Sequence, residues 1–370
     1  MVNLKIKILY SFLLLILERG SHQRFHYTLK SYEEKKYDFS DPILLCSGNF
    51  ILGVGSYDRW WGRSHHASLI LSNYSKSSPG LFIRSLEGFT SPLPLIKSFG
   101  KLNFSFFANQ LESNRAIKNP FLISGRLSFN PLNGLTIGLT RSIMFGGDGK
   151  DNSFKALWDS IRGDASTTQG KSDENIDNEL AGFDLKYSFR VSDLVWSFYG
   201  QYIGEDGTDY WPWRTFYLAG TEFIFLRGGK LNSVVIEYID TYYNGQDTGT
   251  NVIYEHSSYK SGYRYKGNPL GAFIDGDSNY MHLSINSEIN NATKVEFSVF
   301  YGNLNKDNRG TVNSWGTTNE DFFGFILNFD FNINSKIDIG FNMTSLSESL
   351  LYRGKTLDKN ILGIDFKYRF

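Results

Sequence analysis

Hydrophobic and polar residues alternate one by one in the stretch 360–370, which reads N-I-L-G-I-D-F-K-Y-R-F. Successive side chains of a strand point to opposite faces, so the pattern predicts a β-strand with one apolar and one charged face. These eleven residues, at ~3.3 Å each and tilted by ~45°, rise roughly 26 Å, which matches the apolar band of about 25 Å around a membrane barrel. The apolar face consists of Leu362, Ile364, Phe366, Tyr368 and Phe370.

The aromatic residue Phe370 resembles the last residue of bacterial outer-membrane barrels, where a terminal Phe is the assembly signal. We therefore expect this strand to be the seam that closes a transmembrane barrel, with outer-membrane lipid and the barrel-assembly machinery as partners. For this stretch alone, an edge strand of a soluble sheet is the alternative.

The same alternation recurs in pairs of segments joined by short turns, which predicts β-hairpins over 121–139, 183–198, 281–301 and 323–343. Long connections separate these pairs. Short turns at one end and long loops at the other are typical of outer-membrane barrels, and we expect about 14–18 antiparallel strands with long extracellular loops. The long connections are 146–179, 205–214, 241–279, 303–321 and 346–359.

One charge falls on the predicted lipid face. Arg141 lies in line with Leu135, Ile137 and Leu139, and a cation facing lipid at mid-membrane costs ~2–4 kcal/mol. We therefore predict a β-bulge near Thr140 that rotates Arg141 inward. The stretch 148–178, rich in Asp, Ser, Gly and Lys, predicts a mobile surface loop.

Composition narrows the function classes. The 370-residue chain has 38 acidic and 38 basic residues, so no net charge favours nucleic acid. No run of eighteen apolar residues occurs, which excludes a helical membrane protein. Aromatic residues make up 16% of the chain, which suits strands and the aromatic girdles of membrane barrels. Cys46 is the only cysteine, so no disulfide forms within the chain, and we expect a buried thiol.

The amino terminus allows two interpretations. Lys5 and Lys7 precede an apolar run of signal-peptide length from 8 to 17, but Glu18 and Arg19 follow at once and no A-x-A-like cleavage site is seen. Residues 1–24 are thus either a signal peptide or a truncated amino-terminal segment. The division we predict is 1–24 for that segment and 25–370 for the barrel.

Aromatic side chains lie beside carboxylates, amides and cations in the long loops 205–214 and 241–279. Such rings stack on the C–H face of a sugar while polar neighbours bind its hydroxyls, and Arg264 or Lys266 can pair with uronic-acid carboxylates. Packing of the loops on each other is the alternative. The candidate carbohydrate-binding residues are Glu205, Asp206, Trp211, Trp213, Tyr242, Tyr243, Tyr263, Arg264, Tyr265, Lys266, Asp275 and Asp277.

The sequence gives little support for a hydrolase or a metal site. Ser64 and His65 lie close in sequence, but spacing alone does not supply the orienting acid and oxyanion hole of a hydrolase. The side chains of His65 and His66 diverge on a strand, which disfavours a shared metal. Residues 148–151 lack the ligand pattern of a calcium loop. We expect no catalytic residue, metal or cofactor.

Several short motifs together resemble the capsule assembly Wzi family of outer-membrane proteins. Their order is kept from about residue 50 to the end. The segments are Arg59-Trp60-Trp61-Gly62, Ser68-Leu69-Ile70, Gly125-Arg126-Leu127, Arg141 through Gly146-Gly147-Asp148-Gly149, Leu180-Ala181-Gly182-Phe183-Asp184, Ser197-Phe198-Tyr199-Gly200-Gln201 with Gly204-Glu205-Asp206, Gly262-Tyr263 through Pro269-Leu270-Gly271, and Gly276-Asp277.

The resemblance implies a lumen plugged by inward-folded loops and a non-enzymatic, lectin-like role in holding capsular or extracellular polysaccharide in the bacterial outer membrane. It adds Arg59, Trp60 and Trp61 to the carbohydrate-binding candidates. The family typically has a helical segment and further strands ahead of the barrel, and residues 1–48 show no match to these. The alternative function is a porin-like channel for small solutes.

Overall fold

The computed structural model describes residues 42–56, 59–163, 177–205, 207–208, 211–212, 214–243, 252–307 and 313–368. The chain divides into two units, Met1–Tyr37 and Asp38–Phe370. The first unit and the predicted boundary at residue 24 lie outside the described residues, so that boundary stays a prediction. None of the helices in the described residues has both the length and the apolar character needed to cross a bilayer.

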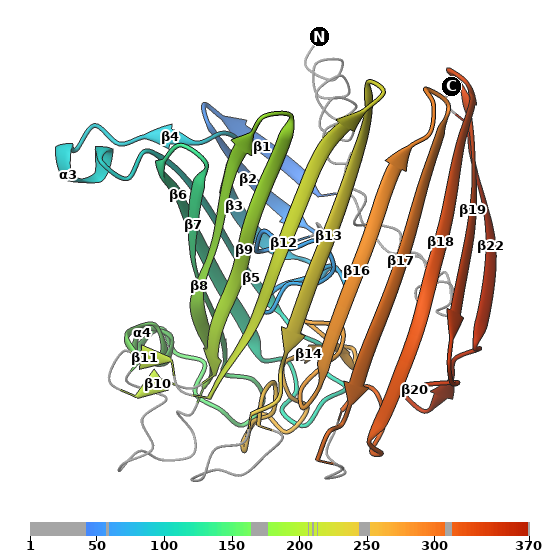
Figure 1. Ribbon diagram of the computed structural model, residues 1–370. Helices are drawn as coiled ribbons and strands as arrows, with labels where there is room; N and C mark the ends of the chain where they lie inside the picture. Colours follow the sequence, from blue (N-terminus) through green and yellow to red (C-terminus); the bar gives the residue numbers. More distant parts are fainter. Residues whose placement is uncertain are drawn as a thin grey trace. The chain divides into compact units, whose positions relative to one another are not determined.

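One antiparallel sheet of 16 strands curls into a barrel wall (Figure 1). Consecutive strands are neighbours along it, which confirms the predicted all-β antiparallel architecture. In spatial order the strands are β1 (Ile43–Ser47), β2 (Phe50–Gly55), β3 (Gly80–Ser85), β5 (Lys101–Gln110), β6 (Phe121–Leu132), β7 (Leu135–Phe145), β8 (Asn178–Val191), β9 (Leu194–Glu205), β12 (Thr215–Arg227), β13 (Lys230–Asp240), β16 (Asn279–Glu288), β17 (Thr293–Leu304), β18 (Glu320–Asn334), β19 (Ile337–Leu346) and β22 (Asn360–Tyr368), with β4 (Phe89–Thr90) paired to β5.

The connections between the strands of the wall contain short hairpins and helices. They are the hairpins β10 (Gly207–Thr208) with β11 (Trp211–Pro212), β14 (Arg264–Tyr265) with β15 (Asn268–Pro269) and β20 (Leu351–Tyr352) with β21 (Lys355–Thr356), and the helices α3 (Pro94–Lys97) and α4 (Phe154–Arg162). The predicted hairpins and long connections agree with these bounds. Among the described residues, the connection that carries α3, residues 86–100, is the one long segment at the short-turn end (Figure 1).

Strands β1 and β22 are the two edges of the sheet. Cys46 of β1 is exposed, so the expected buried thiol is wrong. Strand β22 pairs with β19 from Asn360 to Tyr368, and within the described part of the chain no hydrogen-bonded ladder joins it to β1. The predicted closing contact of residues 360–370 is therefore not formed among these residues.

The two faces of the wall differ as the alternation predicts. On β16, Met281 and Ile285 point outward and are 51% and 43% exposed, whereas the intervening His282 and Ser284 are 2% and 1% exposed. An outward apolar face over a polar inner face is the pattern of a strand that separates lipid from a lumen.

Aromatic residues line the outer face near the long loops on five of the strands from β9 to β18. The strand register places Tyr202 beside Tyr217, Tyr238 beside Met281, and Tyr301 beside Phe323. Bands of Tyr and Trp mark the membrane–water boundary of barrels. We call Tyr202, Tyr217, Tyr238, Tyr301 and Phe323 the long-loop girdle.

The predicted bulge near Thr140 is wrong. Strand β7 pairs in regular register with both β6 and β8 through this point, and the irregularity of β6 lies between Phe129 and Leu132. Arg141 keeps its outward parity because it sits near the long-loop end of the strand. There its Nη2 donates to Glu179 Oε2 at 2.8 Å, so the charge needs no rotation inward.

The stretch 148–178 was also expected to be a loop throughout, but Phe154–Arg162 form helix α4. Ser153 caps its first turn by accepting a hydrogen bond from the Ala156 backbone at 3.1 Å. Gly163 ends the helix in the left-handed conformation. The polar composition of the stretch concealed these capping signals.

Two isoleucines of the same hairpin test the lipid-facing assignment. Ile285→Arg places a cation within the apolar band and should cost about 2–4 kcal/mol of unfolding free energy in vesicles, whereas Ile289→Arg at the turn should cost about 0–1 kcal/mol. Denaturant titration of vesicle-inserted protein, followed by tryptophan fluorescence, measures both. Equal costs at the two positions would contradict the assignment.

Candidate functional site

Two connections from the long-loop end fold into the lumen. They are residues 59–79, between β2 and β3, and residues 252–278, between β13 and β16. Leu69, Tyr254 and Tyr263 are fully buried, each with 0% exposure. We call these two segments the plug, and they confirm the predicted plugged lumen.

Polar side chains of the wall bind the plug backbone. Glu237 of β13 accepts from the His66 backbone N–H at 2.8 Å. Gln201 of β9 accepts from the Leu69 N–H at 2.9 Å and donates to the Trp61 carbonyl at 2.7 Å. The inner face is thus polar because it must satisfy a non-helical backbone that crosses the lumen.

Charges on the inner wall are paired with one another. Lys186 Nζ lies 2.8 Å from Glu222 Oε2, and His65 Nε2 of the plug lies 3.2 Å from the same carboxylate. Arg126 Nη2 donates to Asp184 Oδ1 at 2.9 Å. Buried charges require such partners, so these groups stabilise the filled lumen.

An aromatic floor supports the second segment of the plug. Phe273 packs edge-on against Tyr280 of β16 at 4.9 Å between ring centroids, and Tyr280 neighbours Phe300 of β17 at 5.9 Å. All three side chains are at most 5% exposed. The inner face is therefore apolar where it meets apolar parts of the plug.

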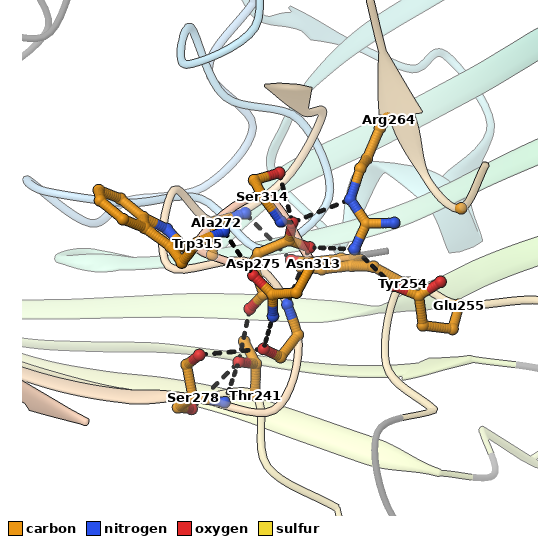
Figure 2. A network of polar contacts seen from close by, with 12 residues as sticks. Thr241, Tyr254, Glu255, Arg264, Ala272, Asp275, Ser278, Asn313, Ser314 and Trp315 are labelled. Atoms are coloured by element: carbon orange, nitrogen blue, oxygen red, sulfur yellow. Dashed lines mark hydrogen bonds and ion pairs between the residues drawn. The ribbon is translucent and has the colours of Figure 1, made fainter. Parts of the chain in front are cut away.

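Arg264 and Asp275 form the centre of a buried network (Figure 2). The guanidinium donates to both Asp275 oxygens at 2.9 and 2.7 Å and to Glu255 at 2.5 Å. Asp275 also accepts from the Ser314 hydroxyl at 2.6 Å. Burial raises the pKa of Glu255, and Arg264 opposes this rise. The network joins the plug to the connection between β17 and β18.

Most predicted carbohydrate-binding residues belong to this interior. The side chains at most 7% exposed are Arg59, Trp61, Glu205, Tyr263, Arg264, Tyr265, Asp275 and Asp277. Their contacts with the protein make them supports of the site, and direct sugar contact by them stays a prediction. Asp206 and Trp213 lie outside the described residues, as does the side chain of Trp211 in β11.

Other predicted residues reach the surface of the long-loop end. Trp60, Tyr242 and Tyr243 are partly exposed, and Lys266 is exposed. Lys266 Nζ lies 5.2 Å from the Tyr265 ring centroid, which fixes this cation above an aromatic face. These four side chains keep solvent-accessible surface, and sugar contact by them stays a prediction.

The sequence reasoning missed Lys306 and Arg353. Lys306 Nζ lies 4.3 Å from the Tyr242 ring centroid, and the Arg353 backbone donates to the Ser314 carbonyl at 2.7 Å. Both cations are exposed, and their loops meet the buried network from different parts of the chain. Only the tertiary contacts place them near the predicted residues. We call Tyr242, Tyr243, Lys266, Lys306 and Arg353 the rim cluster.

A protein-family model, capsule assembly protein Wzi, matches residues 43–347. The chain belongs to this family.

A solved structure has the same barrel. The outer-membrane protein Wzi of Escherichia coli, involved in group 1 capsule assembly and described as a carbohydrate-binding β-barrel, superposes with a TM-score of 0.76 at 23% identity over 88% of this chain and 69% of that one. An uncharacterised 55.8 kDa protein in the cps region of Klebsiella pneumoniae is 31% identical over 173 residues, 46% of this chain and 34% of that protein. The matched part thus spans about a third of that relative.

Two glycines in the motifs that resemble the Wzi family have a steric role. A Cβ at Gly62 would collide with the Gln201 side chain, and one at Gly271 would collide with the Leu69 carbonyl oxygen. Both glycines let the plug approach the wall or itself more closely than any side chain permits. These two motif glycines therefore lie at close contacts of the plug.

Asp177 gives this Wzi-family barrel a pH dependence. Burial raises the pKa of Asp177 to about 7, and nearby Glu179 adds to the rise. The unfolded carboxyl has a pKa of about 3.9, so between about pH 4 and pH 7 the folded protein holds a proton that the unfolded chain has lost. Stability from this group is present below that window and is lost as the pH rises through it.

Asp177→Asn should remove this part of the dependence. We expect the wild-type unfolding midpoint, followed by the heat-dependent gel shift, to fall relative to the variant as the pH rises through that window. Asp193→Asn, at a turn where the side chain is 85% exposed, is the matched control and should follow the wild type. Parallel curves for wild type and Asp177→Asn would contradict the assignment.

Arg264→Lys tests the network that holds the plug. A lysine keeps the charge but cannot make the two-pronged contact with Asp275, and weakening a buried pair costs up to about 3–5 kcal/mol. We expect faster proteolysis of residues 252–278 and higher ion conductance in planar bilayers. Lys266→Arg, two residues away and exposed, should leave both unchanged. Unaltered conductance and proteolysis in Arg264→Lys would show that the plug does not depend on this pair.

Proposed function

We propose that this chain is an outer-membrane barrel that binds capsular or other extracellular polysaccharide at its long-loop end and supports capsule attachment. The observation that carries the proposal is the exposed rim cluster together with a plug that is bound to the inner wall of the barrel. The rim presents side chains to a ligand that approaches from the cell surface. Long barrel loops face the outside of the cell.

The rim cluster has the chemistry of a site for acidic sugar. Tyr242 and Tyr243 supply flat rings with a polar edge, which can stack on a pyranose and bind a hydroxyl. Lys266, Lys306 and Arg353 supply cations for uronic-acid carboxylates. The buried network beneath them holds these loops in place, so the cluster is preorganised for binding.

The comparisons support the same function at a coarser level. The Wzi of Escherichia coli is described as an outer-membrane, carbohydrate-binding barrel, and it shares its fold with this chain. Lipid and the barrel-assembly machinery are further proposed partners. We also propose residues 25–370 as the barrel and 1–24 as a separate segment.

The structure gives less support to the two alternative functions, a porin-like channel and a hydrolase. A porin-like channel requires a continuous aqueous path, but residues 59–79 and 252–278 occupy the lumen. For a hydrolase, Ser64 and His65 would have to act together. Instead the Ser64 hydroxyl donates to the Ala67 carbonyl and His65 pairs with Glu222.

Replacing Tyr242 and Tyr243 by Ala should weaken polysaccharide binding. Truncating an aromatic contact at a binding site costs about 1–2 kcal/mol, a loss of roughly five- to thirtyfold in affinity. Calorimetric titration of the purified barrel with capsular polysaccharide measures this, together with retention of polysaccharide on cells. Tyr187→Ala, which removes an exposed ring from the outer wall, is the control. Unchanged affinity in a folded double variant would rule out the rim cluster as the site.

A further inference from the structure

Helix α4 has an apolar face that is exposed in the described part of the chain. Ala156 and Ser160, four residues apart, are buried. Phe154, Trp158 and Ile161 follow one another at helical spacing on a different face and are 77%, 49% and 39% exposed. Three large apolar side chains in one row on a nine-residue helix indicate a surface that contacts something other than water.

A charged row lies on the remaining face of the helix. Lys155 Nζ lies 2.7 Å from Asp159, and Arg162 Nη2 lies 3.0 Å from the other oxygen of the same carboxylate. At about 100° per residue, the buried, apolar and charged rows are each about a third of a turn apart. The helix is therefore built for three surroundings: protein, an apolar medium and water.

Helix α4 contacts the outer surface of the barrel. Arg141 of β7 and Glu179 of β8 both have outward parity, because their neighbours Leu139 and Ala181 lie on that face. Arg141 donates to the carbonyl oxygens of the last helical turn, to Ser160 at 2.8 Å and to Ile161. The cation also favours the negative end of the helix dipole. The helix thus lies beside the long-loop end of the wall (Figure 1).

The height of α4 coincides with the membrane boundary. Leu139 pairs with Phe183, and these side chains are 48% and 42% exposed. They lie two residues, or ~7 Å along the strand, from Arg141 and its paired residue Ala181. The centroid of the Phe183 ring lies 5.8 Å from that of Tyr202 in the long-loop girdle. The helix therefore docks one step beyond the last lipid-facing residues.

We propose that α4 is an interfacial helix that inserts Phe154, Trp158 and Ile161 into the outer leaflet of the membrane. Its apolar row continues the lipid-facing surface of β7 and β8, and its charged row faces the head groups, as in helices that lie in the membrane plane. The end of the helix also contacts the Arg141–Glu179 pair at this boundary. It would anchor the connection 146–177 beside the polysaccharide site. The inference rests on the proposed membrane-spanning barrel.

Spin labels distinguish the three surroundings of the full chain. In a Cys46→Ser background, Phe154→Cys, Trp158→Cys and Lys155→Cys each receive a nitroxide. The protein is inserted into vesicles of phosphatidylethanolamine and phosphatidylglycerol, and collisions of the label with oxygen and with a water-soluble nickel chelate are measured. A label at Phe183→Cys on the lipid-facing wall reports whether the barrel itself is inserted. The heat-dependent gel shift confirms that each variant is folded.

We expect the labels at 154 and 158 to collide several-fold less with nickel than the label at 155, and to collide readily with oxygen. Nickel access at 154 and 158 equal to that at 155 would overturn the inference, because the face would then lie in water. Low access to both reagents would also overturn it, because protein would then cover the face. If the label at 183 is open to nickel as well, the membrane-spanning barrel fails together with the helix.

Discussion

The constraint on which this structure depends is that each strand separates two solvents. Lipid supplies no hydrogen bonds, so the strands between the two edges, β1 and β22, pair with a neighbour on each side, and the outward side chains are apolar. The inward side chains, in contrast, carry amides, carboxylates and cations. Two of these inward groups, Gln201 and Glu237, accept hydrogen bonds from the backbone of the plug.

The plug and the surface loops are a single hydrogen-bonded unit. Asp275 accepts from Arg264 in the same loop and from Ser314 in the next long connection. The Arg353 backbone in turn binds the Ser314 carbonyl. Three connections that are distant in sequence are thereby fixed against each other. At the proposed rim site, a ligand would meet a surface whose shape is set before binding, so less ordering entropy would oppose association.

Arg141 illustrates how context alters the meaning of a charge. Arg141 interrupts the apolar row of its own strand, and this row by itself predicts a bulge that removes the charge from lipid. The structure keeps the row and instead adds a second layer, in which Glu179 and the end of α4 surround the guanidinium. A local pattern identifies such a conflict, but the neighbouring strand and the following helix decide how it is resolved.

The sequence alone located four hairpins and the last strand of the wall, but not the strands upstream of residue 121 or those over 215–240. Period-two alternation gave the hairpins, the outward face and the short and long connections, because neighbouring side chains on a strand must face different surroundings whatever lies beyond. It could not determine which loop aromatics remain accessible. Tyr263 and Tyr243 look alike in sequence, yet Tyr263 is buried and Tyr243 partly exposed. That difference depends on contacts between loops far apart in the chain, and these form only when the barrel brings the ends of its strands together.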